Sequence, residues 1–246
     1  MREQQSRPGE RSNPQGKSVT NKILLAIPDE EYHLLRPHVE FVSLPHHRSL
    51  HEPNARLEFL YFPNRGLLSL VVSTKQGRTV EVGIVGNEGL AGTPSVAGLR
   101  SSPLREVVQI SGDGFRVKAK ALEIVLKSTP QLQKMLYRYA ILQGLQVAQT
   151  AACNRLHNVE QRLARWLLMT QDRVDAGLLP ITHDFLATML GTDRPTVSLA
   201  AALLQRKRVI RYIHGAVRIL NRKRLEAAAC ECYGVIQRFN GELGLR

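Results

Sequence analysis

The chain of 246 residues is poor in features that mark secreted and membrane proteins. Its three cysteines, Cys153, Cys230 and Cys232, do not indicate a framework of several disulfides. No apolar run approaches the roughly 18 residues that a membrane-spanning helix needs. The polar start MREQQSRPGE lacks the apolar core of a signal peptide. We therefore expect a cytoplasmic protein with no membrane partner.

Acidic residues are scarce relative to basic ones. The 21 Asp and Glu stand against 34 Lys and Arg, which leaves a formal net charge of +13 and favours a polyanionic partner such as nucleic acid. The excess is densest in residues 159–246, with 14 basic against 8 acidic side chains. Residues 23–158 carry 15 against 11, and residues 1–22 carry 5 against 2.

Motifs of the common enzyme classes are missing. The sequence contains no P-loop, no G-x-S-x-G and no H-E-x-x-H, and no pair of carboxylates stands near the glycine-rich residues 86–92. We therefore expect that the protein is not an enzyme. An enzyme that binds nucleotides through the glycine-rich residues remains an alternative.

Composition divides the first half of the chain into a tail and a β-rich part. Residues 1–22 are rich in Ser, Gln, Pro, Gly and Arg, which predicts a flexible tail. Pro28 and Asp29 can start a short helix that reaches Leu35. Between Val39 and Val117, six short stretches rich in β-branched and aromatic residues predict an antiparallel barrel or sandwich.

A long helix follows. From a cap at Ser128 or Thr129, with Pro130 in the first turn, helical spacing of apolar residues continues to His157. Such a length favours pairing with a second copy in a homodimer, and the alternative is packing on its own barrel. The predicted apolar seam comprises Leu132, Met135, Leu136, Tyr139, Leu142, Leu145, Ala148, Ala152 and Leu156, with Gln143, Gln146 and Gln149 fixing the register.

The next segment predicts a helix-turn-helix. Thr182 can cap a first helix, Gly191 permits a tight turn, and Asp193 can cap a second helix with Pro195 in its first turn. The dipeptide His214-Gly215, between two alternating stretches, predicts a hairpin that would form the wing.

This arrangement suits a DNA major groove, which admits one helix and is read by the residues at its N-terminal end. Arg194 can donate two hydrogen bonds to guanine, while basic side chains around it can neutralise phosphates. The predicted DNA-binding residues are Thr182, Asp193, Arg194, Thr196, Ser198, Arg206, Lys207, Arg211 and Arg218, with Arg222, Lys223 and Arg224 as further phosphate contacts. A non-specific nucleic-acid binder that uses charge alone is an alternative.

The stretch ITHDFLATMLGTDRPTVSLAAALLQRKRVI resembles the helix-turn-helix of the Crp/Fnr transcription regulators. The resemblance implies an α+β fold with an N-terminal antiparallel β jelly-roll of the cyclic-nucleotide-binding type, a long dimerisation helix and a C-terminal winged helix-turn-helix. The resemblance covers residues 23–225, so the tail (1–22) and the last twenty or so residues lie outside it. We expect the chain to divide into this tail, a sensor domain (23–126), the dimerisation helix (127–158) and the DNA-binding domain with a C-terminal helix (159–246).

The same resemblance implies a transcription regulator that binds a near-palindromic operator on double-stranded DNA as a homodimer through helix 130–157, with RNA polymerase as a further candidate partner. Within the motif, Arg194 matches the family. Pro195 stands where a base-contacting Glu is usual, and Leu199 where a second Arg is usual. The operator is therefore expected to differ from the family's familiar half-site.

Residues 83–109 resemble the phosphate-binding cassette of cyclic-nucleotide domains, with an effector pocket at Gly86, Glu88, Gly89, Leu90 and Arg100 or Arg105. The glutamate stands one position late and the Arg-Ser/Thr pair that would clamp a cyclic phosphate is missing. We expect a degenerate pocket without a bound cyclic nucleotide.

Other sensing chemistries lack their residues. An iron–sulfur cluster of the family's type needs cysteines in the N-terminal region, where this chain has none. His46, His47 and His51 lack a recognisable ligand spacing, and no histidine stands out as a haem ligand. Cys230 and Cys232 are expected on the final helix, with side chains that point apart as buried thiols. We therefore expect no cofactor and no metal.

Overall fold

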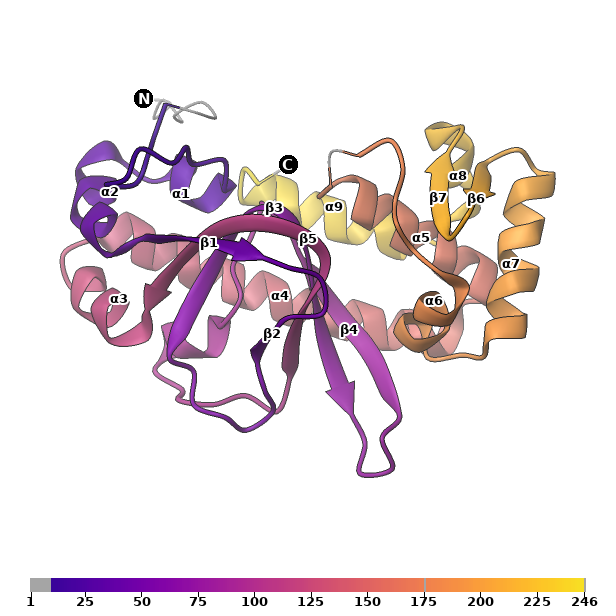
Figure 1. The fold of residues 1–246 in the computed structure, drawn as a ribbon, viewed down its shortest axis with the longest axis horizontal. Coiled ribbons are helices and arrows are strands. Elements are labelled where there is room, and N and C mark those ends of the chain that lie inside the picture. Colours follow the sequence, from indigo (N-terminus) through magenta and orange to yellow (C-terminus); the bar gives the residue numbers. More distant parts are fainter. Residues whose placement is uncertain (1–9, 175, 246) are drawn as a thin grey trace.

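The computed structural model describes residues 10–174 and 176–245. Figure 1 shows a β-rich part, a long helix behind it and a second group of helices with a small hairpin at one end. This α+β arrangement confirms the predicted fold class. None of the helices in the described residues is both long and apolar enough to cross a membrane.

The β-rich part is one antiparallel sheet with the order β1-β5-β3-β4, in which β2 also pairs with β5. Its strands are β1 (Glu40–Leu44), β2 (Ser49–His51), β3 (Phe59–Ser73), β4 (Thr79–Val85) and β5 (Arg105–Lys118). The 3-10 helix η2 (Thr93–Ala97) lies between β4 and β5.

Two of these strands are longer than the sequence predicts, because β3 and β5 each join two predicted stretches. The interruptions around Gly66 and Gly112 are irregularities in register rather than turns. Gly66 has a φ of 94°, and a Cβ on Gly112 would lie 2.0 Å from the carbonyl oxygen of Arg65. The two strands therefore approach closely at positions without a side chain, next to the buried residues Phe62 and Phe115.

Three short helices precede the sheet: α1 (Lys22–Ala26), α2 (Asp29–Leu35) and the 3-10 helix η1 (Arg36–His38). The prediction of a flexible tail is wrong for residues 10–22. Arg11 donates to the carbonyl oxygen of Ile27 at 2.7 Å, and Val19 is fully buried. Polar composition concealed these contacts, since buried polar groups are satisfied here by distant backbone. Residues 1–9 of the predicted tail lie outside the described residues.

After α3 (Ala119–Leu126), the long helix α4 (Pro130–Leu156) agrees with the predicted range. Its first turn is capped by a distant residue, since the Glu31 carboxylate accepts from the backbone N–H groups of Gln131 and Leu132 at 2.9 and 2.7 Å. Thr129 is the N-cap residue, one of the two predicted positions, but its side chain does not cap the helix, because its hydroxyl donates back to the carbonyl oxygen of Val125 at 2.9 Å.

One face of α4 packs against its own sheet. Leu132, Leu136, Tyr139 and Leu142 are buried there. The glutamines predicted to fix a dimer register contact the same chain instead. Gln143 accepts from the Thr93 hydroxyl, Gln146 donates to the carbonyl oxygen of Ile84 at 3.2 Å, and Gln149 donates to the Cys232 sulfur at 3.0 Å.

The opposite face of α4 is apolar and exposed. Tyr137, Ile141, Leu145 and Leu156 have exposed fractions of 45, 69, 42 and 74%. Since Tyr137, Ile141 and Leu145 follow at intervals of four residues, they form one stripe along the helix.

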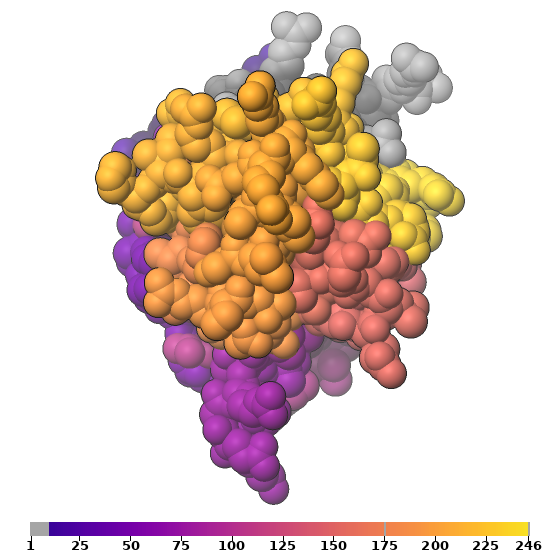
Figure 2. Space-filling view, turned by 90° about the vertical axis from the view of Figure 1, so that its right-hand side faces the viewer, coloured from indigo at the N-terminus to yellow at the C-terminus, as the bar shows by residue number. Residues whose placement is uncertain are grey.

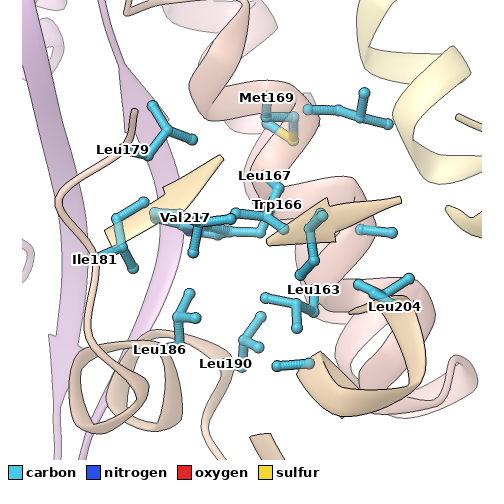
Figure 3. Close-up of a cluster of buried hydrophobic side chains, with 14 of the residues drawn as sticks. Leu163, Trp166, Leu167, Met169, Leu179, Ile181, Leu186, Leu190, Leu204 and Val217 are labelled. Carbon is cyan, nitrogen blue, oxygen red and sulfur yellow. The ribbon is translucent and has the colours of Figure 1, made fainter. Parts of the chain in front are cut away.

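The C-terminal part begins with α5 (Val159–Gln171), which starts in a capping box of Asn158 and Gln161. It continues with α6 (His183–Leu190), α7 (Arg194–Arg206), the hairpin β6 (Ile210–Ile213) and β7 (Ala216–Ile219), α8 (Arg222–Ala228) and α9 (Cys232–Glu242). Figure 3 shows its core, in which Trp166, Leu186, Leu190 and Val217 converge.

This core extends into the sheet. Leu67, Ile84 and Ile110 of the β-rich part belong to the same buried cluster as Leu163 and Leu167 of α5. The helix α6 also packs against β4. The C-terminal part therefore rests directly on the sheet as well as on α4.

Candidate DNA-binding site

Cap and turn residues fix where helices α6 and α7 begin and where the chain turns between them. The Thr182 hydroxyl accepts from the N–H of Phe185 at 3.2 Å, and the Asp193 carboxylate accepts from the N–H of Thr196 at 2.8 Å. Gly191 turns the chain between the helices with a φ of 60°. The three predicted cap and turn residues are confirmed in these local roles.

Packing fixes which side of α7 faces outward. Val197, Ala200 and Leu204 are buried against α5 and α6, where Phe185 meets Trp166 in an edge contact with ring centroids 5.8 Å apart. Because this side is buried, the opposite side of α7 is exposed.

Arg194 begins α7 on its exposed side. Its Nε lies 3.5 Å from an Asp184 oxygen, and both side chains are about two-thirds exposed, at 65 and 67%. Such a pair contributes little to stability in water, so the guanidinium is free to exchange partners. Leu199 is 61% exposed on the same helix.

Two hydroxyl side chains follow Arg194 on the first turns of α7. Ser198 Oγ is hydrogen-bonded to His183 Nδ1 at 2.9 Å, and Thr196 is half-buried. Burial lowers the pKa of His183, and the nearby charge of Arg194 lowers it further. The pKa of Asp193 is lowered because its carboxylate accepts from Thr196 at the helix N-terminus.

The hairpin places two arginines side by side. Arg211 and Arg218 are direct cross-strand partners, and both are exposed. His214 and Gly215 turn the chain with φ values of 47° and 78°, as a two-residue hairpin requires. Figure 2 looks onto this end of the molecule, where α6, α7 and the hairpin form the near face.

The remaining basic side chains predicted to contact DNA differ in whether they already form ion pairs. Arg206 is exposed, and Lys207 is exposed but forms an ion pair with Glu160 at 2.5 Å. Arg222 does not fit the predicted phosphate role, because its guanidinium is held by Asp172 at 2.6 Å and by Glu226 at 3.0 Å.

Comparison with known proteins agrees with this geometry. Residues 161–228 match the family described as the Crp-like helix-turn-helix domain. A search of curated proteins finds no match. Among solved structures, FixK2 from Bradyrhizobium japonicum is 18% identical with a TM-score of 0.66, over 78% of this chain and 98% of FixK2.

Two further structures are similar. The c-di-GMP responsive global regulator CLP from Xanthomonas campestris is 15% identical with a TM-score of 0.63, over 78% of this chain and 99% of CLP. TTHB099, a transcriptional regulator of the CRP family from Thermus thermophilus, is 19% identical with a TM-score of 0.62, over 76% of this chain and 96% of TTHB099. This chain has the fold of the Crp/Fnr regulators.

Within that Crp/Fnr fold, the predicted phosphate-binding turn is filled by side chains. Glu88 is buried and paired with Arg173, with 2.7 Å between Oε1 and Nε, and its other oxygen accepts from the N–H of Gly86 at 3.1 Å. A Cβ on Gly89 would lie 1.8 Å from the Tyr139 hydroxyl oxygen. The glycines thus make room for Arg173 and Tyr139 of the protein itself.

The other predicted pocket residues lie elsewhere. Leu90 is fully buried in the core, and Arg105 lies 3.4 Å from Glu52. Arg100 lines an open cleft of about 880 Å³ together with Arg56, Lys118 and Tyr137. The structure therefore does not bring the predicted effector residues together around one cavity.

The N-terminal histidines do not form a ligand set. His51 is buried, and both of its ring nitrogens are hydrogen-bonded: Nδ1 to the carboxylate of Glu106 at 2.7 Å and Nε2 to the carbonyl oxygen of Phe59 at 2.8 Å. His46 and His47 stack on each other, with ring centroids 3.7 Å apart.

The expectation that the protein has no cofactor is wrong. The ligand atoms of Cys153, His157, Cys230 and Cys232 all lie within 4.8 Å of one another, a group that could hold a metal ion. The sequence signal was present as a C-x₃-H spacing and a distant C-x-C. The prediction that Cys230 lies on the final helix hides this signal, because that helix begins at Cys232.

Proposed function

We propose that the protein is a sequence-specific transcription regulator of the Crp/Fnr type that binds a near-palindromic DNA operator as a homodimer. The observation that carries this proposal is the exposed N-terminal end of α7, with Arg194 at its first position beside the paired arginines of the hairpin.

In this proposal α7 enters the major groove. The N-terminal end of a helix carries a partial positive charge, which favours nearby phosphates, and its first side chains reach the base edges. Arg194 donates to guanine O6 and N7, since the exposed ion pair with Asp184 does not hold its guanidinium in place. Thr196 and Ser198 lie on the same turn and contact a base edge or phosphate.

The flanking groups hold the DNA backbone. Phosphate contacts come from exposed side chains on three elements: Thr182 at the start of α6, Arg206 and Lys207 at the end of α7, and Arg211 and Arg218 on the hairpin. Asp193 acts indirectly, by capping α7. Each phosphate neutralised releases counterions, so binding weakens steeply with salt.

Dimerisation uses the exposed stripe of α4. Tyr137, Ile141 and Leu145 form an apolar row that a second copy of α4 can cover. A two-fold axis along this seam would repeat the α7 surface, so the half-sites would lie about one DNA turn apart, as for other helix-turn-helix dimers.

The sensor part has a degenerate pocket in this proposal, and its effector is of unknown chemistry. The residues around 86–90 contact both α4, through Tyr139, and the segment that follows α5, through Arg173. An effector would act by favouring one of two positions of the DNA-binding domain relative to the sheet.

The test compares two exposed arginines on duplexes enriched from a random pool. Arg194→Ala is expected to reduce discrimination at one position of each half-site by about 1–3 kcal/mol. Arg211→Ala is the matched control, expected to weaken all duplexes similarly and to lower the salt slope by about one phosphate contact. Fluorescence anisotropy at several salt concentrations measures both.

The competing function is charge-driven binding without sequence preference. If Arg194→Ala weakened every duplex by the same factor as Arg211→Ala does, this competing function would be supported and the proposal would fail.

A further inference from the structure

A cluster of thiols and an imidazole lies apart from the DNA-binding surface. Cys153, Cys230 and Cys232 are buried, with exposed fractions of 0, 4 and 1%, and His157 completes the group at half-buried depth. The three cysteines are free thiols. Buried cysteines alone would fit an apolar cluster, but a histidine among them brings a second type of metal ligand to the same point.

The fold brings the four residues together from two segments. Cys153 and His157 stand four residues apart at the C-terminal end of α4 and so project from the same side of the helix. Cys230 belongs to the connection between α8 and α9, and Cys232 is the first residue of α9. Because Cys230 lies outside the helix, both thiols of the C-x-C pair can turn to the same point.

The distances match the edges of a coordination tetrahedron. Sγ of Cys153 and Sγ of Cys230 are 3.5 Å apart, and Sγ of Cys232 lies 3.7 Å from Nδ1 of His157. Zinc–sulfur bonds of about 2.3 Å and zinc–nitrogen bonds of about 2.0 Å give tetrahedral edges of roughly 3.5–3.8 Å. Two of the six distances between the ligand atoms are thus close to those around one shared ion, and all four atoms lie within 4.8 Å of one another.

Neighbouring groups orient the ligands as in known metal sites. Nε2 of His157 lies 3.2 Å from a carboxylate oxygen of Glu231, which leaves Nδ1 directed at the thiols. A carboxylate on the far nitrogen of a histidine ligand is the common outer partner of zinc sites. Gln149 donates to Sγ of Cys232 at 3.0 Å, a contact that suits a thiolate.

We propose that Cys153, His157, Cys230 and Cys232 bind one Zn²⁺ ion in a closed, four-coordinate site. Three thiolates and one imidazole form a ligand set of structural zinc sites, and four protein ligands leave no open position for catalysis. Soft thiolate ligands select against Mg²⁺ and Ca²⁺. Binding releases the thiol protons to solvent.

The ion would fasten the C-terminal helix to the dimerisation helix. α9 packs along α4 and α5, and Arg138 of α4 also donates to the carbonyl oxygen of Glu242 at 3.0 Å. Figure 1 shows α9 running beside α4 near the middle of the molecule. Zinc binding would therefore fix the position of the DNA-binding part relative to the dimer seam.

The direct test is the metal content of untagged protein purified in reducing buffer without chelator. Elemental analysis is expected to find close to one zinc ion per chain. Cys232→Ser and His157→Gln should lose most of it, whereas the control His33→Gln, at an exposed histidine of α2, should retain it.

A milder variant removes the outer carboxylate without touching a ligand. Glu231→Gln alters a side chain that is 76% exposed, so the fold should be unaffected. Zinc affinity, measured by competition with a chromogenic chelator, is expected to fall about 10-fold. Glu242→Gln, at an exposed glutamate at the other end of α9, should leave the zinc affinity unchanged.

Cobalt gives a readout on the unaltered chain. Co²⁺ added to metal-free protein should produce the thiolate charge-transfer and tetrahedral visible bands, and Zn²⁺ should bleach them. Absence of zinc together with absence of these bands would overturn the proposal, as would iron in place of zinc or a disulfide between Cys153 and Cys230 in the isolated protein. None of these readouts depends on DNA binding.

Discussion

Glu81 is a buried carboxyl group where the sheet meets the DNA-binding part. Its oxygens accept from the Ser69 hydroxyl at 2.5 Å and from Nε1 of Trp166 at 2.6 Å. Burial raises its pKa to about 7, although these hydrogen bonds and the charges of Arg165 and Arg173 act in the opposite direction. Within the folded protein, the protonated form is therefore favoured in mildly acidic solution.

This shift predicts a pH-dependent stability. Unfolded Glu81 ionises near its ordinary pKa of 4.5, while the folded group stays protonated to about 7. The contribution of protonated Glu81 to the free energy of unfolding is thus complete below pH 4.5 and is lost as the pH rises to about 7. At about 1.4 kcal/mol per pKa unit, the loss is on the order of 3 kcal/mol. The free energy of unfolding of Glu81→Gln should not show this loss, because the amide does not ionise.

Urea denaturation between pH 4.5 and 8 measures the effect as the difference between variant and unaltered protein. Glu123→Gln, at an exposed carboxyl group of α3, serves as the control and should follow the unaltered protein. Equal pH slopes for all three proteins would contradict the assignment to Glu81.

Residue-scale prediction from the sequence succeeded where the determining contact is local. Thr182 and Asp193 accept from the backbone three residues ahead, so their roles follow from the local sequence. Glu88 is different, because its partner Arg173 is 85 residues away and decides whether the turn is open or filled. A sequence motif for a phosphate-binding turn does not show whether a distant side chain, such as Arg173, fills it.

At the scale of elements, α4 shows which part of a pattern can be predicted. Helical spacing gave its length and range, because both depend on local residues. It did not separate the face that covers the sheet from the face that stays exposed, since both are apolar. The three glutamines have partners on η2, β4 and α9, which helical spacing does not reveal.

The exposed stripe of α4 predicts a dimer that a charge can break. Ile141 is 69% exposed and central in the stripe, so Ile141→Glu should bury a carboxylate in the seam and shift the protein toward monomer by at least 10-fold in dissociation constant. Light scattering coupled to size-exclusion chromatography over a range of concentrations measures the mass.

Ile124 of α3 provides the control, because it is 67% exposed but lies off the stripe. Ile124→Glu should keep the mass of the unaltered protein. A monomer at all concentrations for the unaltered chain, or a dimer unaffected by Ile141→Glu, would contradict the proposed seam.

At the scale of the whole molecule, the order of parts was predictable and their contacts were not. Changes in residue periodicity along the chain mark a sheet, a long helix and a helix-turn-helix in succession. The contacts that join them, such as Arg173 with Glu88 and Trp166 with Glu81, connect residues 85 positions apart. Those contacts place the DNA-binding part on the sheet, with α7 at the far end (Figures 1 and 2).

Binding of the proposed kind requires two copies of α7 to contact DNA across a two-fold axis. Hydroxyl-radical footprinting on the best duplex from the random pool tests this most directly. We predict two protected regions of equal strength, about 10 base pairs apart centre to centre, over sequences related by a two-fold axis. A single protected region, or even protection of the entire duplex, would contradict the account.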